Sequence, residues 1–312
     1  MKIDRHKPDQ RFRRATDRVS LGIGLLIGVL IWPAESQAND PSADEQANRF
    51  MVSVMDRLAN GSAFDAKVRE KIWTTGREVP GVGTYVQSGQ GAGRYRLQVA
   101  MHDGVGKHQL QQVADGRLAW TRLAIADRVT LRRVNLGLLR QKLGDHPERD
   151  GVAISFQVGG FIERLETIRR QYDLRLAVGT LDYRRVWIVS GKLKDEVREQ
   201  ILAQSGRGSW PAMCPAQVRV AFAAEDDPQT QFGLGLPVRF EFLTDATSEP
   251  GDASSKVATG SRLISLIELY SVRPIATPPE SHFRFENTDA DVNFTDDTQY
   301  YLDRLGSSLT ES

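Results

Sequence analysis

Residues 94–101 read Arg94-Tyr95-Arg96-Leu97-Gln98-Val99-Ala100-Met101, so that polar or small residues alternate with large apolar ones. Successive side chains of a β-strand point to opposite faces of the sheet. One face of this strand therefore carries Tyr95, Leu97, Val99 and Met101. A sheet with one apolar face has to cover that face with helices, a second sheet or a ligand. The stretch predicts a half-buried strand in such a sheet.

The same period of two continues on both sides of this stretch. It predicts strands at 68–75, 83–87, 107–114, 117–125 and 129–134, and later at 173–181, 183–193, 217–223, 237–243 and 263–272. Glycine-rich breaks at 89–93, 103–106 and 115–116 have the composition of hairpin turns. Consecutive hairpins form an antiparallel meander. The strand at 237–243 repeats the alternation, with Val238, Phe240 and Phe242 on one face.

Helical periodicity appears between the strands. Ser42 and Glu45 form a capping box before a first amphipathic helix that extends to about Leu58. A clearer helix is predicted over 160–172, where Phe161, Leu165, Ile168 and Tyr172 share one side. Shorter helices are expected at 135–143, 194–204 and 297–305. These elements predict an α+β fold in which helices cover an antiparallel sheet.

Composition limits the function classes. The 312 residues contain 41 Lys+Arg and 40 Asp+Glu, a net charge of +1 that provides no basic field for nucleic-acid phosphates. Cys214 is the only cysteine, so a disulfide within the chain is excluded. No Cys/His cluster with zinc-ligand spacing occurs either. Stability is expected to come from a hydrophobic core.

The N-terminus has the pattern of an export signal. Seven of the first 18 residues are basic, residues 19–32 are mostly apolar, and Ser36-Gln37-Ala38 has the small-x-small pattern of a cleavage site. This apolar stretch is shorter than the ~20 residues that span a bilayer. We expect a signal peptide at 1–38, cleaved after Ala38, with an uncleaved inner-membrane anchor as the alternative. The remaining chain is interpreted as one domain over 39–286 and an acidic tail with a short helix over 287–312.

Motifs for catalysis and for cofactors are absent from the sequence. It contains no GxSxG or HExxH motif, and its glycine-rich segments lack the spacing of a phosphate loop. The tail from Asp289 resembles the start of a calcium loop, but Phe294 stands where that loop needs glycine. We therefore assign no catalytic residue, cofactor or metal and expect a protein that is not an enzyme. A secreted hydrolase is the least favoured alternative.

Several segments in order resemble one family. They are Gly83-Thr84-Tyr85-Val86-Gln87, Arg94-Tyr95-Arg96-Leu97, Val113-Ala114-Asp115-Gly116-Arg117-Leu118-Ala119-Trp120, the run 266–272, and His282-Phe283-Arg284-Phe285. This succession is similar to that of the periplasmic lipoprotein carriers, the LolA/LolB-like proteins, over about 50–285. The chain resembles the larger, divergent members, with 144–151 and 244–261 as additions to the family pattern.

The resemblance implies a strongly curved, unclosed antiparallel half-barrel covered by helices, located in the periplasm or cell envelope. It implies an apolar hollow that binds a lipid or lipoprotein acyl chain, with an inner- or outer-membrane protein as a further partner. The residues expected to line the hollow are Tyr95, Leu97, Val99, Met101, Leu118, Trp120, Val238, Phe240 and Phe242. Alternation does not decide which face is hollow, and ordinary core packing is the alternative role for each residue. The alternative function is an envelope sensor or scaffold of the same fold that binds a protein partner.

Overall fold

The computed structural model describes residues 42–74, 77–143, 148–149, 152–153, 157–211, 213–245, 261–289 and 292–310. The expected signal peptide at 1–38 lies outside these residues, as do most of 144–151 and 246–260. The described residues belong to one compact unit.

The described residues contain five α-helices and fourteen strands. The helices are α1 (Ala43–Asn60), α2 (Leu136–Leu143), α3 (Gly160–Gln171), α4 (Asp195–Ser205) and α5 (Thr298–Thr310). The strands are β1 (Phe64–Thr74), β2 (Arg77–Gln87), β3 (Arg94–His102), β4 (Lys107–Asp115), β5 (Leu118–Ile125), β6 (Arg128–Asn135), β7 (Glu148–Arg149), β8 (Val152–Ala153), β9 (Tyr172–Leu181), β10 (Arg184–Leu193), β11 (Gln217–Ala223), β12 (Pro237–Leu243), β13 (Leu263–Pro274) and β14 (Phe294–Asp296). A 3-10 turn lies at Glu280–Phe283.

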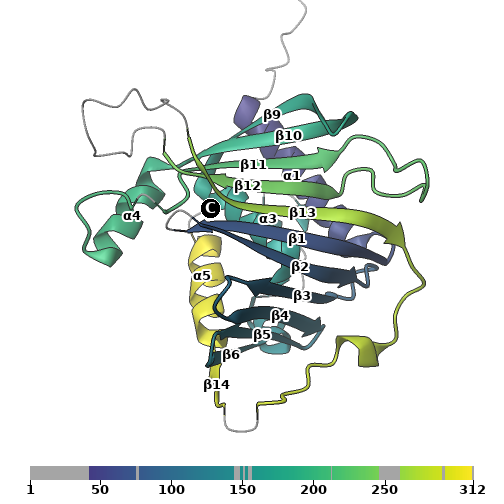
Figure 1. The fold of residues 1–312 in the computed structure, drawn as a ribbon, viewed down its shortest axis with the longest axis vertical. Coiled ribbons are helices and arrows are strands. Elements are labelled where there is room, and N and C mark those ends of the chain that lie inside the picture. Colours follow the sequence, from purple (N-terminus) through teal and green to yellow (C-terminus); the bar gives the residue numbers. More distant parts are fainter. Residues whose placement is uncertain are drawn as a thin grey trace, which may run out of the picture. The chain divides into compact units, whose positions relative to one another are not determined.

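Twelve of these strands form one open sheet in the order β14-β6-β5-β4-β3-β2-β1-β13-β12-β11-β10-β9. β1 pairs with β2 on one side and with β13 on the other, and thereby joins two meanders into the single layer seen in Figure 1. All neighbours are antiparallel except β14, which pairs in parallel with the edge of β6. The predicted α+β fold with an unclosed, helix-covered sheet is confirmed, and the parallel strand β14 is the departure from it.

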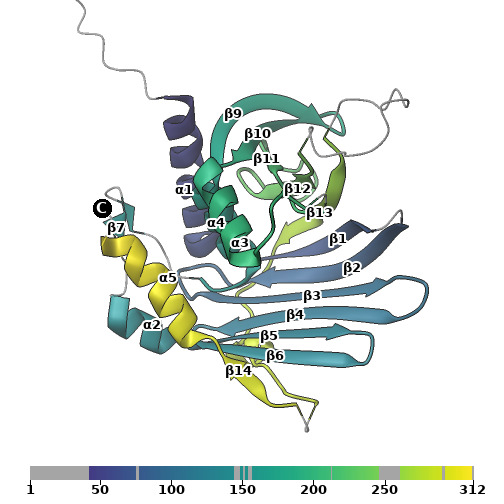
Figure 2. The same cartoon turned by 90° about the vertical axis from the view of Figure 1, so that its left-hand side faces the viewer.

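The two meanders differ in curvature. Strands β9 to β13 curl around α1 and α3, whereas β2 to β6 extend as a flatter layer with α2 and α5 at one end (Figure 2). α2 and α5 pack against each other. We call the face of the sheet that α1 and α3 cover the inner face, and the opposite face the outer face.

Local chemistry sets the start of α1. The Ser42 Oγ accepts a hydrogen bond from the backbone N–H of Glu45 at 3.2 Å, as the capping box predicts. Asp44 in the first turn accepts one from the backbone N–H of Leu174 at 2.8 Å. That amide belongs to β9, the edge strand, so α1 also protects the beginning of this edge.

Strand β2 is longer than predicted. Its pairing with β1 extends from Gln87 back to Arg77 and includes Pro80 and Gly81. Both are typical turn residues, so the sequence indicated a strand only from Gly83. Pairing with neighbours on both sides overrides that local preference.

Candidate functional site

The nine residues expected to line the hollow do not share one face. The register pairs Tyr95 with Gln87 and Ala114, and thereby places Tyr95, Leu97, Val99 and Met101 on the inner face with Phe240 and Phe242. In β5 the residue opposite Ala114 is Ala119, so the neighbouring Leu118 and Trp120 point to the outer face. The expectation that these two residues line the same face as Tyr95 is wrong.

Val238 occupies a third position. It lies between the register pairs Ala221–Arg239 and Phe222–Pro237, where β12 carries an extra residue. It lines a pocket together with Arg69, Arg239 and Glu268, which the register places on the outer face.

Side chains from the helices fill much of the inner face. Phe161 of α3 packs between Tyr85, at 4.7 Å between ring centroids, and Phe240, at 5.5 Å. Tyr95 is buried, and its hydroxyl donates to the carbonyl oxygen of Val158 at 2.7 Å. Burial raises the pKa of Tyr95 well above its usual value, so this hydroxyl stays protonated. Around these residues the expected hollow is therefore filled by side chains and forms part of the hydrophobic core.

Aromatic side chains also fill the space between α1 and the curled strands β10 and β11. Phe50 of α1 lies with its ring centroid 5.4 Å from that of Trp187 and 5.2 Å from that of Phe222. Phe222 is buried, as are Leu97, Val99 and Phe240 among the predicted residues.

Farther along β3, β4 and β5 the inner face becomes exposed. The register places Met101, Leu110, Leu123 and Ile125 on that face. Met101 and Leu110 are half-buried, whereas Leu123 and Ile125 are 37% and 53% exposed. We call these four residues the inner strip. Of these four, only Met101 was expected from the sequence, although the alternation in β4 and β5 also indicates the others.

Trp120 has a structural partner on the outer face. Its ring stacks on Phe285 with centroids 5.0 Å apart and planes at 13°. Phe285 belongs to the C-terminal strap, our name for residues 275–289 and 292–297, which follow β13, lie along the right and lower sides of the sheet in Figure 1, include β14 and precede α5. Beside Trp120, Arg122 binds Asp289 with two hydrogen bonds of 2.5 and 3.0 Å. Trp120 therefore holds the strap and is turned away from the inner strip.

The charges that hold the strap predict an acid-dependent release. The hydrogen bond from Arg133 lowers the pKa of Asp296 to about 2, and that from Arg122 lowers the pKa of Asp289. An unfolded aspartate has a pKa of about 3.9, so the contribution of these carboxylates is complete above about pH 4 and is lost as the pH falls toward 2. The protection factors of the strap amides against hydrogen exchange should fall in this window before those of β1 to β3. Arg122→Gln combined with Arg133→Gln should raise strap exchange at neutral pH; equal exchange in both proteins would contradict this account.

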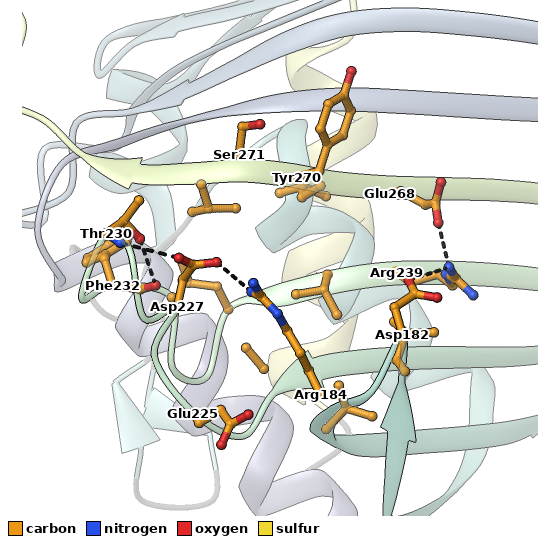
Figure 3. Close-up of a pocket in the computed structure, with 18 of the residues that line it drawn as sticks. Asp182, Arg184, Glu225, Asp227, Thr230, Phe232, Arg239, Glu268, Tyr270 and Ser271 are labelled. Atoms are coloured by element: carbon orange, nitrogen blue, oxygen red, sulfur yellow. Dashed lines mark hydrogen bonds and ion pairs between the residues drawn. The ribbon is translucent and has the colours of Figure 1, made fainter.

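Figure 3 shows the pocket on the outer face, which we call the outer pocket. It has a volume of about 570 Å³ and lies between the β9–β10 turn, the loop 225–235, and strands β12 and β13. Arg184 reaches across it to Asp227 at 2.5 Å, and the hydrogen bond from Arg184 lowers the pKa of Asp227. On the opposite wall, Arg239 binds Glu268 at 2.7 Å.

In the described part of the chain, no three His, Cys, Asp or Glu side chains are grouped so as to hold a metal ion. Cys214 is a free, half-buried thiol. Among the same residues no helix has the length and apolar character needed to cross a membrane.

Comparisons with known proteins give matches to solved structures. One chain of the MucA/MucB complex of Pseudomonas aeruginosa matches with 13% identity and a TM-score of 0.38, over 80% of this chain and 63% of that one. LprF of Mycobacterium bovis matches with 12% identity and a TM-score of 0.32, over 75% and 97% of the two chains. A LolA superfamily protein of Nitrosomonas europaea matches with 11% identity and a TM-score of 0.28, over 76% and 97%.

The chain thus spans less than two thirds of the length of the first of these structures. No protein-family model matches the sequence, and no curated protein matches it significantly. The description of the fold as an unclosed, helix-covered sheet rests on the strand order and helical contacts of the sheet itself.

Proposed function

We propose that this chain is an exported, non-enzymatic binding protein that holds an acyl chain, of a lipid or a lipoprotein, against the inner strip. The supporting observation is the exposure of Leu123 and Ile125 on a sheet face that helices bury elsewhere. Removing each CH2 of a ligand from water contributes ~0.8 kcal/mol, so an apolar chain that covers this strip would be held without covalent chemistry.

The end of the inner strip also offers a cation. Arg128 of β6 is the register partner of Ile125, points to the same face and is exposed. A carboxylate or phosphate attached to the acyl chain would lie beside this guanidinium. The expected ligand is therefore an anionic amphiphile whose apolar part follows the strip.

The buried residues from the sequence analysis have a conditional role in this proposal. Leu97, Val99 and Phe240 would meet a ligand only after α3 moves and withdraws Phe161 from the hollow. Such a movement exchanges contacts between helix and sheet for contacts between ligand and sheet. Leu118 and Trp120 have no part in it because they point to the outer face.

Uptake of a fluorescent fatty acid by delipidated protein tests the proposal. Leu123→Asp and Ile125→Asp each place a charge within the strip and should weaken binding at least about tenfold. Val82→Asp is the matched control, because Val82 is 61% exposed but lies on the outer side of β2. It should bind like the unmodified protein.

Two outcomes would contradict the proposal. One is equal uptake by all three variants and the unmodified chain. The other is the absence of saturable uptake by the unmodified chain, which would favour the alternative of a sensor or scaffold that binds a protein partner.

A further inference from the structure

We propose that the outer pocket is a second binding site, which takes a short, nearly uncharged peptide segment of a partner protein. The pocket lies on the face opposite the inner strip, so this inference does not depend on the acyl-binding function. Its volume of about 570 Å³ falls within the range of pockets that bind small ligands.

The floor of the outer pocket is apolar. Leu181, Val186 and Val238 line it, with Val186 buried and the other two half-buried. Together these three side chains offer an apolar surface to one side chain of a ligand. Burying an aliphatic or aromatic side chain there is favourable in proportion to the apolar area removed from water.

 

The rim of the pocket carries charges of both signs. Five arginines and four carboxylates line it, so the pocket is close to neutral. Arg184 and Asp227 form one ion pair of 2.5 Å, and Arg239 binds Glu268 at 2.7 Å on the other side (Figure 3). Guanidinium groups only donate hydrogen bonds and carboxylates only accept them. A ligand that satisfies both needs donors and acceptors side by side, as in a peptide backbone.

Other ligand classes fit this rim less well. A bare acyl chain would remove the water that hydrogen-bonds to the ion pairs and would supply no hydrogen-bonding group in its place. A strongly anionic ligand would meet the carboxylates of Asp182 and Glu225. The guanidinium of Arg69 lies 5.0 Å from the centroid of the Tyr270 ring and covers a face on which a sugar ring would otherwise stack. The peptide is the class that the rim and the floor accept together.

The backbone around the pocket is held in uncommon conformations. Ser271, within β13, has a φ of +51°, and Gln231, in the loop between the lining residues Thr230 and Phe232, also has a φ of +51°. Non-glycine residues adopt this region at a cost and keep it where the surroundings fix it, which is frequent at ligand sites. These two positions fix the shape of the wall.

Selection from a phage-displayed library of random twelve-residue peptides against the full chain tests the proposal. The enriched peptides should share an apolar residue flanked by polar residues, with a net charge near zero. Fluorescence anisotropy of a synthetic enriched peptide should show binding that Arg184→Ala weakens about tenfold or more. Arg219→Ala is the matched control, because Arg219 pairs with Glu241 at 3.3 Å on the same face but outside the pocket. Its affinity should stay within about twofold of that of the unmodified chain.

A second variant tests the outer pocket without removing the Arg184–Asp227 ion pair. Glu225 lies on the exposed rim, so Glu225→Lys should shift the enriched peptides toward acidic sequences without unfolding the chain. The proposal is overturned if no sequence family is enriched, or if the enriched peptides bind Arg184→Ala as well as the unmodified chain. Peptides that lose binding with Ile125→Asp would instead belong to the inner strip. Fatty-acid uptake should be unchanged in Arg184→Ala, so the two sites fail separately.

Discussion

Replacing Phe161 with alanine is expected to lower the free energy of unfolding by about 3–5 kcal/mol. The ring is buried between Tyr85 and Phe240, and its removal leaves a cavity where α3 meets both halves of the sheet. Typical domains have only about 5–15 kcal/mol of stability in total, so the change is large. Urea unfolding followed by circular dichroism measures it.

Phe294→Ala is the matched control for this prediction. Phe294 is 44% exposed and contacts Trp120 and Arg133 at the edge of the outer face. Its loss should cost only about 1 kcal/mol, because much of the ring is already in water. Equal losses in the two variants would show that Phe161 does not join helix and sheet in the way described.

Gly159→Ala is expected to cost about 3 kcal/mol or more. Gly159 precedes α3 with a φ of +80°, a conformation that L side chains rarely adopt. A Cβ at this position would lie 1.9 Å from the hydroxyl oxygen of Tyr95, which is buried and bonded to Val158. The substitution therefore adds a steric clash to backbone strain. Thermal or urea unfolding again provides the measurement.

Gly104→Ala separates the two contributions. Gly104 lies in the β3–β4 turn with a φ of +90°, but no atom lies within 4 Å of the position of an added Cβ. It should lose only the cost of backbone strain, about 1 kcal/mol. A Gly159→Ala protein that is no less stable than Gly104→Ala would disprove the close contact between α3 and Tyr95.

Phe161→Ala and Gly159→Ala both act where α3 is held against the rest of the domain. The Glu163 carboxylate accepts hydrogen bonds from the backbone N–H of Gly159 at 2.5 Å, from the Tyr301 hydroxyl at 2.9 Å and from Arg304 at 3.0 Å. α3 is thus bound to α5, and any movement of α3 that admits a ligand has to break or carry these bonds. Opening of the hollow and release of α5 are therefore expected to be coupled.

Much of the fold follows from local patterns in the sequence. Alternation in 94–101 and the turn residues at 103–106 and 115–116 predicted β3, β4 and β5, and the spacing of Phe161, Leu165 and Ile168 predicted α3. These patterns work because side-chain direction within one strand or helix depends only on the local geometry of the backbone.

The candidate sites were less predictable because they depend on relations between elements. Identifying the inner strip requires the register of β3, β4 and β5 and the place where the helices cease to cover the sheet. The outer pocket joins residues from β1, the β9–β10 turn, the loop 225–235 and β13, which are far apart in the chain. Their charges have no common sequence motif.

The sequence by itself determined which segments are strands, where they turn and which side chains within each strand share a face. Only the tertiary structure decided how the faces of different strands correspond, and Trp120 shows why. One residue more or less in a turn reverses the face of every side chain that follows, so alternation within β5 could not place Trp120 relative to Tyr95. Its partner Phe285 comes from the C-terminal strap, and long-range packing of this kind leaves no local pattern in the sequence.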